Sequence, residues 1–84
     1  MPKPSDLPTV RELIEFYEGD TCRGSISFMD EPSQINWIAG RALSDTGGNA
    51  AQAIHVIQGW SDYPQAYRMA AQGMLAEILK GRRR

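Results

Sequence analysis

Cysteine and histidine are almost absent from this sequence, which has one copy of each in 84 residues. The lone thiol, Cys22, cannot form a disulfide within the chain or build a cysteine metal site. Long apolar runs are also missing, because no stretch approaches the roughly 18 residues that a membrane helix needs. We therefore expect a protein of the reducing cytoplasm, without a membrane span, a metal or another cofactor.

The scarcity of reactive side chains also argues against an enzyme. A catalytic site needs a nucleophile with its base, a pair of carboxylates in a cleft, or a cofactor motif. His55 has no nearby Cys, Asp or Glu at ligand spacing. The Gly47-Gly48 pair lacks the lysine and the further glycines of a phosphate-binding loop. The sequence therefore predicts a protein that is not an enzyme.

The composition fits one small domain with an uneven distribution of charge. Hydrophobic residues make up 42% of the chain and charged residues 23%, which is too apolar for disorder. We expect a single domain over residues 1–84, with a mobile lead at 1–7 and a basic tail at 81–84. Residues 1–36 hold three basic and seven acidic groups, whereas residues 37–84 hold six basic and three acidic groups. This asymmetry is either chance combined with the preference of helix C-termini for cations, or a charge dipole that would orient head-to-tail self-association or steer a charged partner.

Apolar spacing predicts a compact all-α fold of four helices, and the first two have clear N-terminal signals. Thr9 and Glu12 form a capping box, and Gly19 ends the first helix. Asp30 caps the second helix, with Pro32 in its first turn. Both starts depend on residues that lie close together in the chain.

The second half of the chain predicts two more helices, separated by marked breaks. A turn at residues 44–49, rich in Gly, Asp and Asn, precedes a third helix expected over residues 50–60. Residues 61–64 break the chain again and cap the fourth helix, which Gly81 ends.

Residues 22–29 alternate small or apolar with polar side chains, which is the period of a strand. The pattern predicts either an extended connector that places Ile26 and Phe28 in the core, or a short edge strand. An edge strand would pair with another copy or another protein, because its backbone groups lack partners.

The fourth helix has two apolar faces. Its core row has helical spacing and consists of Tyr67, Ala70, Ala71, Met74, Leu75, Ile78 and Leu79. A second row consists of Ala66, Met69, Gly73 and Ala76, and its small residues would let another helix approach closely. Since each other helix offers one stripe, we expect the fourth helix to be central. Its second row is then either covered within the monomer or used as an interface with another chain. We favour the interface.

Trp37 and Arg41 are further candidates for partner binding. Trp37 lies about 200° around the second helix from the core residue Ile35, and Arg41 follows one turn later. A guanidinium there would stack on the indole, and both residue types are enriched at binding hot spots. The alternative is that the second helix is buried on both sides, which would make Trp37 a core residue.

A DNA-binding regulator is the alternative function, with the second and third helices as a helix-turn-helix-like unit. The loop of five or six residues is longer than the usual three or four, and the third helix has no Arg or Lys. The residues that would contact nucleic acid are Gln52, His55, Arg68, Arg82, Arg83 and Arg84.

We therefore expect a small non-enzymatic module for protein–protein interaction that forms a homo-oligomer. It would act as a regulator, adaptor or inhibitor, through a partner protein that the sequence does not identify. A chain of this size also suits a phage or plasmid accessory protein that blocks a host complex.

Overall fold

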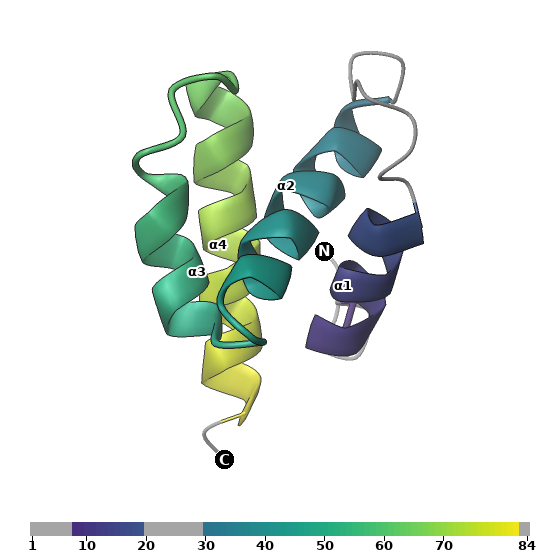
Figure 1. The fold of residues 1–84 in the computed structure, drawn as a ribbon. Helices are drawn as coiled ribbons and strands as arrows, with labels where there is room; N and C mark the ends of the chain where they lie inside the picture. The colour runs from purple at the N-terminus through teal and green to yellow at the C-terminus, as the bar shows by residue number, and fades with distance from the viewer. Residues whose placement is uncertain (1–7, 20–29, 83–84) are drawn as a thin grey trace.

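The computed structural model describes residues 8–19 and 30–82, and these residues form four helices (Figure 1). They are α1 (Val10–Gly19), α2 (Glu31–Asp45), α3 (Ala50–Ile57) and α4 (Gln65–Arg82). The predicted all-α domain of four helices is confirmed. Residues 1–7, the candidate strand at 22–29 and the last two arginines of the tail lie outside the described residues.

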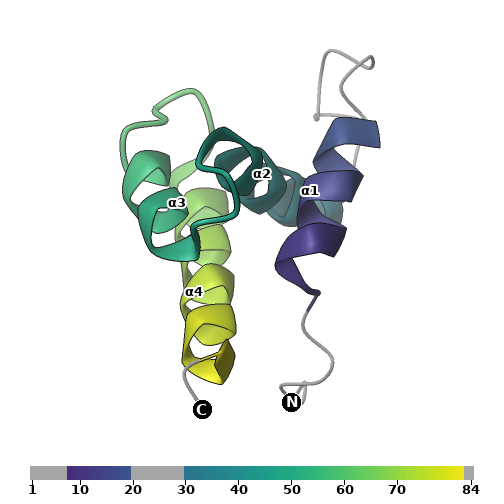
Figure 2. The same ribbon diagram turned by 60° about the horizontal axis from the view of Figure 1, so that its bottom comes forward.

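The central helix is α2, which packs against each of the other three. The α3–α4 hairpin lies on one side of α2 and α1 on the other (Figures 1 and 2). The expectation that the fourth helix is central is therefore wrong. None of the described helices has both the length and the apolar character needed to cross a membrane.

The N-terminal signals read from the sequence form the expected hydrogen bonds. The backbone N–H of Thr9 donates to Glu12 Oε1 at 2.9 Å, and the Glu12 N–H donates to Thr9 Oγ1 at 3.1 Å. Asp30 Oδ1 accepts from the N–H of Ser33 at 3.0 Å at the start of α2. Each bond satisfies a donor that a helix N-terminus leaves unpaired.

The connection between α2 and α3 is shorter than predicted, because α2 continues to Asp45 and leaves residues 46–49 between the helices. Thr46 Oγ1 donates to the carbonyl of Ala42 at 2.8 Å, and the N–H of Gly48 donates to the carbonyl of Leu43 at 2.8 Å. Gly47 and Gly48 have φ angles of 67° and 89°. This is a Schellman-type end, in which glycine adopts the left-handed backbone at little cost.

The other helix ends differ slightly from the prediction. The helix α3 ends at Ile57 rather than Trp60, because the N–H groups of Gln58, Gly59 and Trp60 bond to carbonyls three residues back. Such bonds form a tighter turn that does not extend an α-helix. At the other end of the hairpin, α4 continues through Gly81 to Arg82 instead of ending at the glycine.

The buried core is made largely of alanine, leucine and isoleucine. Its members are Leu13, Ile38, Ala39, Ala42, Leu43, Ala50, Ala53, Ile57, Ala71, Leu75 and Ile78. At Gly40 the backbones of α1 and α2 come so close that a Cβ atom there would lie 2.1 Å from the carbonyl oxygen of Leu13. The small residues of α2 thus let neighbouring helices approach closely.

Candidate interaction surface

The outer face of α4 lies opposite the core and remains uncovered. Ala66, Met69 and Gly73 are exposed, and Ala76 is half-buried. Met69 is 61% exposed. A Cβ atom on Gly73 would meet no other atom within 4 Å. In the described part of the chain, therefore, no other helix covers the second apolar row of α4.

The core row of α4 matches the prediction at most positions. Ala71, Leu75 and Ile78 are buried, and the row includes one exposed member, Ala70. The prediction that Ala70 belongs to the core is wrong. The helices α2 and α3 cover a narrower part of the α4 surface than the seven predicted core residues would occupy. Ala70 instead widens the outer face.

The outer face of α4 has no charged side chain over its first three turns. The same three turns do contain one charged residue, Arg68, but its side chain does not lie on this face. Its Nε and Nη1 donate instead to the carbonyls of Tyr63 and Gln58 at 3.0 and 3.3 Å. Charges return on the exposed side with Glu77 and Lys80, which form an ion pair of 3.7 Å. A solvated helix face normally carries polar and charged residues. An exposed face without them is suited to contact another apolar surface.

Phe16 makes a useful comparison, because it is the other large apolar side chain that is exposed in the described part of the chain. It is 37% exposed and lies on α1, where Glu12 and Glu15 are also exposed. A single apolar residue among charged neighbours is ordinary on a protein surface. Met69, by contrast, is flanked on its face by alanine and glycine.

Four aromatic rings form a chain of edge-to-face contacts from α1 to the α3–α4 connection. Tyr17 and Trp37 have ring centroids 5.0 Å apart, Trp37 and Tyr63 are 6.1 Å apart, and Tyr63 and Trp60 are 5.9 Å apart. The interplanar angles near 70° are those that aromatic quadrupoles favour. The cluster joins α1, α2 and the hairpin.

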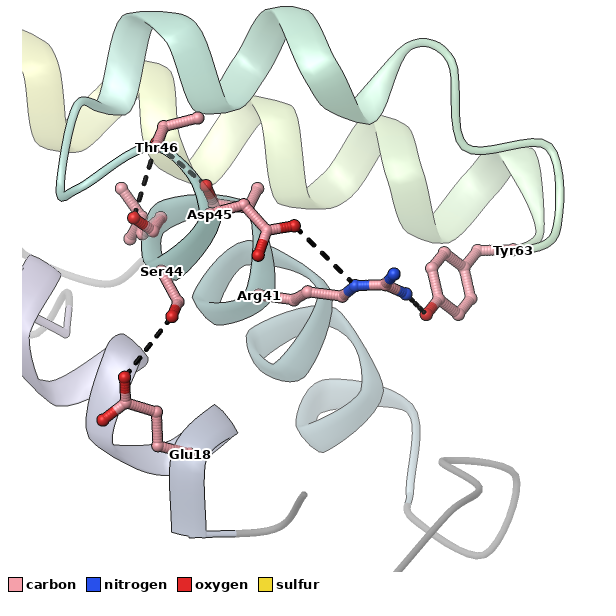
Figure 3. A network of polar contacts seen from close by, with 8 residues as sticks. Glu18, Arg41, Ser44, Asp45, Thr46 and Tyr63 are labelled. Atoms are coloured by element: carbon pink, nitrogen blue, oxygen red, sulfur yellow. Dashed lines mark hydrogen bonds and ion pairs between the residues drawn. The ribbon is translucent and has the colours of Figure 1, made fainter. Parts of the chain in front are cut away.

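Arg41 lies over this cluster and holds the α3–α4 connection against α2. Figure 3 shows its contact with Tyr63. Its Nη1 donates to the hydroxyl oxygen of Tyr63, and its Nε lies 4.0 Å from Asp45 Oδ2. The guanidinium carbon is 4.8 Å from the Trp60 ring centroid. The predicted stacking of Arg41 on a tryptophan is therefore present, but the ring is Trp60 rather than Trp37.

Trp37 occupies a different position from the outer face that its spacing indicated. It is half-buried, packs against the core cluster, and its Nε1 is buried without a hydrogen-bond partner among the described residues. Because α2 is central, packing reaches both sides of this helix. The structure thus agrees with the alternative in which Trp37 belongs to the core, and it separates Trp37 and Arg41 from the outer face of α4.

The residues that would contact DNA are spread over α3 and both ends of α4, as far as the structure describes them. Gln52 and His55 are exposed on α3, but Arg68 is half-buried and bonded to carbonyls near the start of α4. Arg82 ends the same helix, about 21 Å away at 1.5 Å per residue. The four residues between α2 and α3, on the other hand, match a helix-turn-helix connection in length.

The remaining titratable groups give no further site in the described part of the chain. No group of three His, Cys, Asp or Glu residues there is placed to hold a metal ion. Hydrogen bonds from the Ser33 side chain and backbone lower the pKa of Asp30, which serves as a helix cap.

Two features of this arrangement were missed from the sequence. Trp60 and Tyr63 were not among the residues predicted to contact Arg41, although they provide the surface that holds it. Gly40 was passed over, although a glycine inside a helix often marks a close approach of two backbones. Comparison of the chain with protein-family models, curated proteins and solved structures gives no match.

Proposed function

We propose that this protein is a cytoplasmic interaction module that acts by binding another protein through the outer face of α4. It regulates or inhibits its partner by covering a surface, and it carries out no chemistry of its own. The observation that supports this proposal is the exposed, uncharged face of α4 around Met69, directly opposite the buried row of the same helix.

The composition of this face suits a contact with a helix or another flat apolar surface. Alanine and glycine at Ala66, Gly73 and Ala76 keep the backbone accessible, and Met69 provides one adaptable apolar side chain. Little side-chain entropy is lost when such residues are buried, because alanine and glycine have no rotamers to restrict. The face therefore favours close approach over deep insertion.

The proposal is tested by placing the same charge on two exposed alanines. Ala66 and Ala51 are each the second residue of their helix, on α4 and α3 respectively, and both are exposed. Tagged wild type, Ala66→Lys and Ala51→Lys are used as baits in an extract of the native host. Captured proteins are then quantified by mass spectrometry.

The expected result is a protein that wild type and Ala51→Lys retain and that Ala66→Lys loses, because a lysine would have to be desolvated inside the contact. Both variants should keep the wild-type helical circular dichroism. Equal retention by the two variants would contradict the assignment of the contact to α4.

A further inference from the structure

We propose that Met69 is a site of methionine oxidation by peroxide, and that its sulfoxide changes the outer face of α4 from apolar to polar. This inference rests on the proposed function, because it assigns a means of regulation to the same face. Three observations support it: the exposure of the Met69 side chain, the burial of the other methionine of α4, and the separation of Met69 from the core.

The two methionines of α4 differ in their access to solvent. Met69 is 61% exposed. Its neighbours on the helix surface, Ala66 and Gly73, are too small to cover its side chain. Met74 is half-buried and packs against the core cluster. Because the oxidation of a thioether depends on its exposure to the oxidant, peroxide should react with Met69 before Met74.

The reaction changes one atom of the side chain and needs no other residue. The sulfur of Met69 attacks one oxygen of hydrogen peroxide, an S–O bond forms as the O–O bond breaks, and the other oxygen leaves as water. The sulfur is oxidised by two electrons and the peroxide is reduced by two. Methionine sulfoxide reductases reverse the change with a dithiol as electron donor, and the products are water and a disulfide.

The sulfoxide oxygen would lie on a face with no charged side chain over the first three turns of α4. The small residues of this face, Ala66, Gly73 and Ala76, have no side-chain hydrogen-bond donor. The guanidinium of Arg68 already donates to two backbone carbonyls. An apolar surface that covers this face would remove water from the sulfoxide oxygen, and the small residues could not replace it. Oxidation therefore opposes the contact that the thioether favours.

Met69 is separate from the buried core of the described residues. The buried residues of α4 are Ala71, Leu75 and Ile78, and Met69 belongs neither to the core cluster nor to the residues packed against it. Oxidation of a buried methionine disrupts a core, whereas oxidation of Met69 should alter the surface of α4 and leave the helix folded.

Peroxide titration of the purified Cys22→Ser protein tests the site, since this background removes the thiol, which also reacts with peroxide. Met69 and Met74 lie in one tryptic peptide, residues 69–80, so fragment masses assign the added oxygen to one of them. Sulfoxide should accumulate at Met69 first, with unchanged helical circular dichroism. Equal rates at the two positions, or a loss of helical signal as Met69 is oxidised, would overturn the proposal.

Hydrophobic interaction chromatography tests the change in the surface without any partner. The matched control is Met69→Leu in the same background, which keeps an apolar side chain of similar volume without a sulfur atom. The peroxide-treated Cys22→Ser protein should elute earlier than the untreated protein. The Met69→Leu variant keeps every other methionine, so its retention should not change with treatment.

Capture from the host extract tests the regulatory effect. The treated Cys22→Ser bait should recover about tenfold less of the protein that Ala51→Lys retains and Ala66→Lys loses, since an unpaired polar oxygen is buried in the contact. Treatment of the Met69→Leu bait should leave recovery unchanged. Methionine sulfoxide reductases, one for each epimer, should restore recovery by the oxidised bait.

The outcomes distinguish this inference from the proposed function. Unchanged column retention after oxidation at Met69, or undiminished recovery of the captured protein, would overturn the inference and leave the proposed function intact. Equal capture by Ala66→Lys and Ala51→Lys would instead contradict the proposed function. The column retention would then still decide whether oxidation of Met69 changes the polarity of the face.

Discussion

The close approach of α1 and α2 at Gly40 predicts that a single methyl group will destabilise the protein. In Gly40→Ala, the new Cβ would lie 2.1 Å from the carbonyl oxygen and 2.9 Å from the carbonyl carbon of Leu13. An ordinary contact between carbon and oxygen is about 3.3 Å, so α1 must move by about 1 Å. The obstacle is backbone, which cannot rotate out of the way as a flexible side chain would.

The size of the effect follows from two opposing terms. Overpacking a close contact costs about 3 kcal/mol at the upper end of the usual range, which suits a clash with backbone atoms. Replacing glycine by alanine inside a helix returns about 1 kcal/mol. The net loss of about 2 kcal/mol should lower the melting temperature of Gly40→Ala by roughly 8–16 °C.

Gly73→Ala is the matched control, because it makes the same substitution inside a helix where nothing lies within 4 Å of the new atom. It should raise the free energy of unfolding by about 0.5–1 kcal/mol. Both variants are melted by circular dichroism at low micromolar concentration, to keep self-association from contributing. A melting temperature for Gly40→Ala equal to or above wild type would refute the close crossing of α1 and α2.

Three further predictions concern the core, a helix cap and the alternative function. Trp37→Ala should lower the free energy of unfolding by about 2–3 kcal/mol in urea titrations, because it removes a half-buried ring that contacts Tyr17 and Tyr63. An unchanged urea midpoint would mean that Trp37 is a surface residue. The pKa of Asp30 is lowered by its bonds from Ser33, so its stabilising effect is present above the ordinary pKa of 3.8 and is lost as the pH falls through the lowered value. Asp30→Asn keeps a capping oxygen and should therefore show a smaller loss of melting temperature than wild type between neutral and acidic pH; equal slopes would contradict this. Duplex DNA should not be retarded by the protein at low ionic strength, since α3 has no Lys or Arg; retardation would favour the DNA-binding regulator.

Features set by neighbouring residues could be predicted from the sequence. The capping box at Thr9 and Glu12 and the cap at Asp30 depend on bonds across three residues, so the local pattern was sufficient. The exposed row of α4 was also visible as a helical repeat. Its exposure could not be derived, because it depends on which helices the rest of the chain places beside it.

Features set by residues far apart in the chain could not be predicted. Arg41 and Tyr63 are 22 residues apart, and their contact depends on how the α3–α4 hairpin folds back on α2. The central place of α2 likewise depends on the backbone approach at Gly40, which involves Leu13 on another helix. The number of apolar faces on each helix favoured α4 as the central helix. That criterion was insufficient because it does not consider how closely small residues let helices approach.

The position of α2 between α1 and the hairpin has a consequence for cooperativity. Among the described residues, α1 contributes one member of the buried core, Leu13, whereas the other members lie on α2, α3 and α4. Unfolding of α2, by contrast, removes contacts from each of the other three helices. Local opening of α1 therefore needs less free energy than global unfolding. We therefore expect local opening of α1 to leave the outer face of α4 intact.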